Sequence, residues 1–73
     1  MTSHQKEFIK LAIQMAKRTW EYTGAAEKAA TMLEAAEYVC DDLVVLKQLQ
    51  KAREEFEIGA PDTGITLLEM IEL

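Results

Sequence analysis

Residues that break helices are scarce in this chain. Its 73 residues include three glycines and one proline, and none of these lies between Ala25 and Ile58. The rest of the sequence is rich in Ala, Leu, Glu, Lys, Gln and Met, which are strong helix formers. The sequence therefore predicts an all-α fold with turns near Gly24 and near residues 59–62.

The first helix is predicted from about residue 4 to Tyr22. Thr2 followed by Gln5 is typical of a capping box, and Gly24 is a suitable helix stop. The apolar side chains cover about half of the helix circumference, which is wider than the stripe of about 100° that one neighbour covers. We therefore expect this helix to be sandwiched between others. Its apolar residues are Phe8, Ile9, Leu11, Ala12, Ile13, Met15, Ala16, Trp20 and Tyr22.

Residues 25–57 allow either two helices or one long helix. Ala29, Leu33 and Ala36 share one face, whereas Leu49 and Phe56 share a face that is turned by roughly 150° in the same helical frame. A break at residues 40–42 resolves this conflict, because aspartate is a preferred N-cap. We favour two helices. The alternative is one long helix whose halves are buried against different neighbours.

A short last helix is predicted from about Gly64 to residue 72, with Leu67, Leu68 and Ile71 on its apolar face. The four helices would form a small bundle of two helical hairpins, at about 4–39 and 42–72, within a single domain 1–73. A chain this short needs additional stabilisation. A single cysteine excludes an intrachain disulfide, and the usual ligands of a zinc site are missing from the sequence. We expect self-association as a homodimer, with no cofactor.

The two hairpins show a weak internal repeat with an offset of 35 residues. Residues 23–37 and 58–72 share Gly24/Gly59, Ala25/Ala60, Thr31/Thr66, Leu33/Leu68, Glu34/Glu69 and Glu37/Glu72. With Trp20 four residues before Gly24, and the small residues Ala29 and Ala36 after it, the first unit resembles a tetratricopeptide repeat. The resemblance implies a concave peptide-binding surface lined by the first helix of each hairpin. Gln14, Arg18, Leu49 and Arg53 would face it. An ordinary helical bundle is the alternative.

The sequence shows no pattern typical of an enzyme. Cys40 falls on the apolar face of its helix, where a buried and unreactive thiol is expected, and the carboxylates of Glu34, Glu37 and Asp41 are expected to be solvated. Trp20 lies on an apolar face and is expected in the core. Tyr38 lies among polar residues and is therefore a candidate interface residue.

Charge divides the chain unevenly. Residues 1–22 carry four basic and two acidic side chains, whereas residues 23–73 carry four basic and eleven acidic ones. This pattern favours a basic protein partner over nucleic acid. The longest apolar run is far too short to cross a membrane, and a lone cysteine fits a reducing compartment, so we expect a cytoplasmic protein.

Together these features predict a small protein-interaction or regulatory module that modulates a larger protein without catalysis. One alternative is a regulator that binds nucleic acid through Lys6, Lys10, Lys17 and Arg18 of the first helix. Another is a structural subunit of a homo-oligomer. No residue pattern names a substrate or a reaction.

Overall fold

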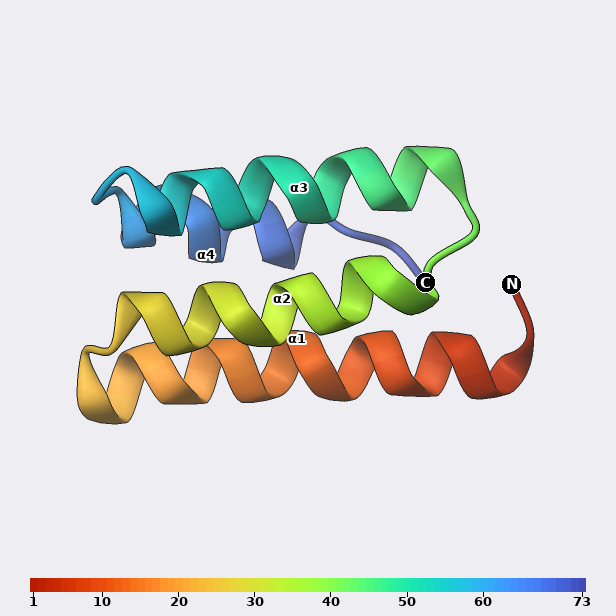
Figure 1. Cartoon of the computed structure of the whole chain (residues 1–73), viewed down its shortest axis with the longest axis horizontal. Helices are drawn as coiled ribbons and strands as arrows, with labels where there is room; N and C mark the ends of the chain where they lie inside the picture. The colour runs from red at the N-terminus through yellow and green to blue at the C-terminus, as the bar shows by residue number, and fades with distance from the viewer.

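In a computed structural model that describes residues 1–73, the chain forms four α-helices and no strand. Figure 1 shows two helical hairpins joined by a short connection, with both termini at the same end of the molecule. The all-α prediction and the division into two hairpins are confirmed. The helices are α1 (Ser3–Thr23), α2 (Ala26–Val39), α3 (Leu43–Glu57) and α4 (Pro61–Glu69).

The predicted capping box and stop define both ends of α1. The backbone N–H of Gln5 donates to the Thr2 hydroxyl at 3.2 Å, and the backbone N–H of Thr2 donates to the Gln5 side chain at 2.7 Å. Gly24 has φ 66° and its N–H donates to the carbonyl of Trp20. Glycine suits this left-handed position because it has no Cβ.

A break at residues 40–42 separates α2 from α3, so the single long helix is wrong. One carboxylate oxygen of Asp42 accepts from the N–H groups of Val44 at 2.9 Å and Val45 at 3.2 Å, which caps α3 as predicted. The side chain of Gln5 also donates to the carbonyl of Val39 at 3.1 Å. This bond satisfies an orphan carbonyl and ties α1 to the end of α2.

The bounds predicted for the last helix are corrected at both ends. It begins at Pro61 instead of about Gly64, because the ring of proline fixes a helical φ and its missing N–H is not needed at the first helical position. It ends at Glu69 rather than at residue 72. The last residues continue beyond α4 as a non-helical segment toward the end of the molecule where the N-terminus lies, as Figure 1 shows, and Ile71 and Leu73 pack against the core.

The hydrophobic core is narrow because small side chains supply much of it. Thirteen buried apolar residues form one cluster, and six of them are alanines. The large side chains that are almost fully buried are Ile9, Leu33, Leu49 and Phe56. Each helix packs on its neighbour in the chain, and α4 makes a minor further contact with α1.

Gly64 lets α4 approach α3 closely. A Cβ added at this position would lie 2.7 and 2.8 Å from ring carbons of Phe56 and 3.2 Å from the carbonyl oxygen of Ala52. Phe56 is 2% exposed, and the carbonyl oxygen of Ala52 belongs to the backbone, so a side chain at position 64 would crowd both. Packing therefore requires glycine at position 64, although glycine is a poor helix former.

We predict that Gly64→Ala destabilises the fold by about 1 kcal/mol or more, although alanine is the better helix former by about 1 kcal/mol. Urea unfolding followed by circular dichroism measures the change. Thr66→Ala on the exposed side of α4 is the control, and it should stay within about 0.5 kcal/mol of the parent chain. In a Phe56→Leu background the cost of Gly64→Ala should shrink. An unchanged cost would contradict the packing explanation.

Candidate functional site

The predicted partner-binding residues do not share one surface. Gln14 and Arg18 are exposed on α1, and Tyr38 is 93% exposed on α2. Leu49 is completely buried, because α3 packs against both α2 and α4 and this face of α3 lies between them. The prediction that Leu49 lines an open surface is therefore wrong.

Arg53 holds α2 and α3 together instead of projecting into solvent. Its Nε and Nη2 atoms donate to the two carboxylate oxygens of Glu37 at 2.5 and 3.3 Å, and its Nη1 donates to Glu57 at 2.9 Å. The hydrogen bond with Glu37 is the main cause that raises the pKa of Arg53 above its ordinary value, while burial acts in the opposite direction. Each of the three guanidinium nitrogens donates a hydrogen bond within the chain, so Arg53 is not free to bind a partner's carboxylate.

A partly uncovered apolar surface lies on α1 and α2. Phe8, Leu11 and Met15 of α1 are 45, 55 and 47% exposed. With Ala12 between them, and Met32 and Ala35 from α2, they line a shallow groove of about 130 Å³ in which every lining residue is apolar. We call these six residues the α1–α2 apolar face. The expectation that α1 is sandwiched within the chain is wrong on this side.

The width of the apolar arc on α1 could have predicted this exposed face from the sequence. Ile9, Ala12 and Ala16 are the residues of α1 that the fold buries, and α2 with a minor contribution from α4 is enough to cover them. Phe8, Leu11 and Met15 on the rest of the arc are only partly covered by the chain. The excess of apolar surface therefore indicated an uncovered face as well as a buried one.

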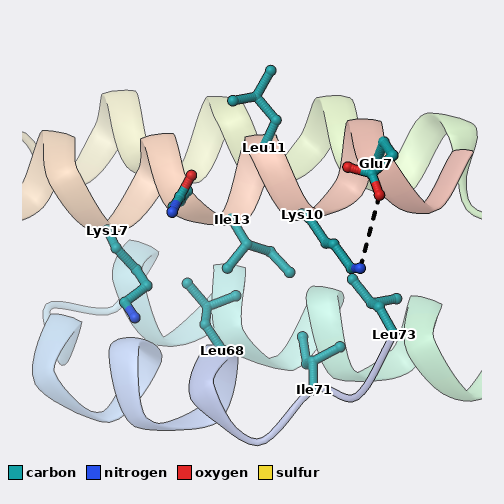
Figure 2. A pocket seen from close by; sticks show the side chains of 9 residues that line it. Glu7, Lys10, Leu11, Ile13, Lys17, Leu68, Ile71 and Leu73 are labelled. Carbon is teal, nitrogen blue, oxygen red and sulfur yellow. Dashed lines mark ion pairs between the residues drawn. The ribbon is translucent and has the colours of Figure 1, made fainter. Parts of the chain in front are cut away.

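A second groove follows the loose contact between α1 and the C-terminal segment. Figure 2 shows Ile13 of α1 pointing toward Leu68 and Ile71, while Leu11 points away from α4. Lys10 lies 3.9 Å from Glu7, and Lys17 lies 3.8 Å from Glu69. Two of the four cations proposed for nucleic-acid binding thus have a carboxylate beside them. The groove has a volume of about 510 Å³.

The side of the molecule formed by α2 and α3 is acidic. Tyr38 lies at a groove with Glu34, Glu37, Leu46 and Gln50. A neighbouring groove between the same helices is lined by Glu27, Glu34 and Glu57 together with apolar and hydroxyl groups. Of these carboxylates, Glu37 and Glu57 already accept from Arg53, while Glu27 and Glu34 make no ion pair within the chain.

The residue types used most often in catalysis are not gathered at any of these surfaces. Cys40 is buried as predicted, and its thiol donates to the carbonyl of Asp42 at 3.4 Å. His4 is exposed in the first turn of α1. No three His, Cys, Asp or Glu side chains are grouped so that they could hold a metal ion.

None of the four helices is both long enough and apolar enough to span a membrane. Trp20 packs, partly buried, against the core as expected.

Comparisons of this chain with protein-family models, curated proteins and solved structures found no match.

We predict that the two ion pairs of Arg53 differ in strength. Glu37→Ala removes a carboxylate that is 12% exposed and leaves the guanidinium without its main partner, so it should destabilise the fold by about 1–2 kcal/mol. Glu57→Ala removes an exposed carboxylate one helical turn away and should cost less than about 0.5 kcal/mol. Urea unfolding of both variants gives the order, and equal costs would contradict the assignment of Glu37 as the main partner.

Proposed function

We propose that this chain is a small protein-interaction module that modulates a larger protein and carries out no reaction of its own. The observation that supports the proposal is the α1–α2 apolar face. Contiguous apolar surface on a soluble protein is typical of a binding surface, because leaving it in water costs about 25 cal/mol for each Å².

The narrow core strengthens the case for a protein partner. A chain of this size buries only about 60% of the surface that it exposes when unfolded, and it has little stability in reserve. Here 14 of 73 residues are buried. Covering Phe8, Leu11 and Met15 with another protein would bury the roughly half of each side chain that the fold leaves exposed. Homodimer formation is one way to do this, and we include it in the proposal.

The acidic side of α2 and α3 supplies a second surface, on which we place the larger protein. Tyr38 offers a rigid aromatic side chain that is 93% exposed, and Glu27 and Glu34 offer free carboxylates nearby. Aromatic anchors surrounded by charge are common at protein interfaces, and the charge here suits a basic partner. A module of this kind regulates by occupying a surface that its target needs, and we place it in the cytoplasm.

The two alternatives have less support. Nucleic-acid binding would use Lys10 and Lys17, each of which lies beside a carboxylate. A purely structural homo-oligomer would leave the acidic surface around Tyr38 without a role. The resemblance to tetratricopeptide repeats stays a prediction, and nothing in the proposal depends on it.

We expect variants of the two surfaces to differ in a capture experiment with an extract of the native host. The tagged parent chain should capture a partner protein, and Tyr38→Ala should capture at least tenfold less of it. The fold should not change, because this side chain is exposed. Leu11→Ser/Met15→Ser tests the apolar face. Met70→Ser is the matched control, because Met70 is 64% exposed and follows the end of α4, outside the α1–α2 apolar face. Identical captured proteins for the parent chain and all variants would contradict the proposed function.

For nucleic acid, we predict no binding to a DNA duplex in a titration at low salt and at physiological salt. Binding through phosphate contacts would weaken steeply as salt rises, because counterions are released. A salt-dependent affinity that Lys6→Ala or Arg18→Ala reduces would favour the nucleic-acid alternative instead.

A further inference from the structure

The exposed side of α1 has a seam with the spacing of a coiled coil. His4, Phe8, Leu11, Met15, Arg18 and Tyr22 follow one another at alternating intervals of four and three residues, and all six are exposed. Side chains at this spacing form one nearly straight row on a helix, and such rows pack between two helices that cross at about 20°. We call these six residues the α1 seam. It runs along the outer edge of the molecule, beside the α1–α2 apolar face, with which it shares Phe8, Leu11 and Met15.

The α1 seam is symmetric about the middle of its helix. The helix extends from Ser3 to Thr23, so its central residue is Ile13. Leu11 and Met15 lie two residues on either side of this centre, Phe8 and Arg18 lie five, and His4 and Tyr22 lie nine. A second α1 laid antiparallel therefore presents a matching residue at every step of the row.

We propose that the α1–α2 apolar face binds a second copy of this chain, with the two α1 helices antiparallel about a two-fold axis near Ile13. The proposal rests on the proposed function and names the partner of that face. Leu11 packs against Met15 of the second copy, twice, at the centre. Phe8 packs against Arg18 toward each end, where a guanidinium can stack on the aromatic ring. His4 and Tyr22 meet at the ends.

Charge favours this orientation over the parallel one. In a parallel pair, Arg18 would face Arg18 within the contact, which is a repulsive arrangement. In the antiparallel pair each guanidinium stands near Glu7 of the other copy and one turn from its own Glu21. Glu7 and Glu21 from different copies lie on the same edge of the contact, and the guanidinium between them offsets their repulsion.

The dimensions of the molecule suit a contact of this kind. A helix of 21 residues is about 31 Å long, so α1 extends over nearly the whole 32 Å length of the molecule. A standard interface of about 800 Å² per partner would cover about a sixth of the 4704 Å² of accessible surface. Ala12 and Ala35 in the groove beside the α1 seam are small enough for a second helix to approach closely.

The test is a charge exchange at the two central positions, with molecular mass measured by sedimentation over a range of concentrations. The parent chain should be a dimer at micromolar concentration. Leu11→Glu and Met15→Lys should each weaken the dimer by about a hundredfold, because each places a charge against an apolar side chain. In the antiparallel pair, the chain with both substitutions sets a carboxylate against an ammonium at both central contacts, so its dimer should return and should weaken as salt rises. Met70→Glu is the control and should dimerise like the parent chain.

Each outcome decides between orientations or partners. In a parallel pair the double variant would set like charges against each other, so failure to recover the dimer overturns the antiparallel contact. A parent chain that stays monomeric at about 100 μM, or a dimer that Leu11→Glu leaves intact, overturns the second copy as the partner. If the parent chain then captures a different protein, and the Leu11→Ser/Met15→Ser variant does not, the proposed function is still supported. Where a single variant loses its helicity because the monomer is unstable, recovery of helicity in the double variant gives the same answer.

Discussion

Close approach of helices through alanine and glycine is the constraint on which this structure depends. Alanines on α1, α2 and α3 and the glycine on α4 let the helix backbones lie near one another, and few large side chains are needed between them. The gain is tight packing in a chain of 73 residues. The cost is a small apolar core, and Phe8, Leu11 and Met15 of α1 remain about half exposed at the surface.

Polar contacts then fix the helices in register where the core cannot. Gln5 joins the start of α1 to the end of α2, Asp42 begins α3, and Arg53 connects α3 to α2. Each acts at a helix end or at the rim of the core, where a partly exposed polar group loses little hydration. This arrangement leaves the uncovered side of α1 free of such contacts. The two proposed surfaces, one apolar and one acidic, both include residues of α2.

Local signals allowed most of the fold to be predicted from sequence. Thr2, Gly24 and Asp42 each specify a helix end through their own backbone or side-chain chemistry, so the first three helices were predicted almost to the residue. The start of α4 at Pro61 follows the same chemistry but was placed too late, at about Gly64. The role of Gly64 depends on the ring of Phe56, which local sequence does not show.

The surfaces were harder to predict, because a helical wheel gives the direction of a side chain but not the number of neighbours. Leu49 and Leu11 are both leucines on apolar arcs, yet the first is completely buried and the second is 55% exposed. The difference arises because α3 lies between two helices and α1 lies at the edge of the bundle. Arg53 is a similar case, since its partner Glu37 is on another helix and 16 residues away.

Packing between helices that follow one another in the chain also determines how the molecule forms. Contacts between α1 and α2, α2 and α3, and α3 and α4 close only short loops, so little chain entropy is lost before each contact is gained. Folds with such local contacts reach the native state in microseconds to milliseconds. Two copies meet by diffusion, and at micromolar concentration this takes far longer. Assembly should therefore be a slow second-order step between chains that are already helical, and its rate should rise with protein concentration.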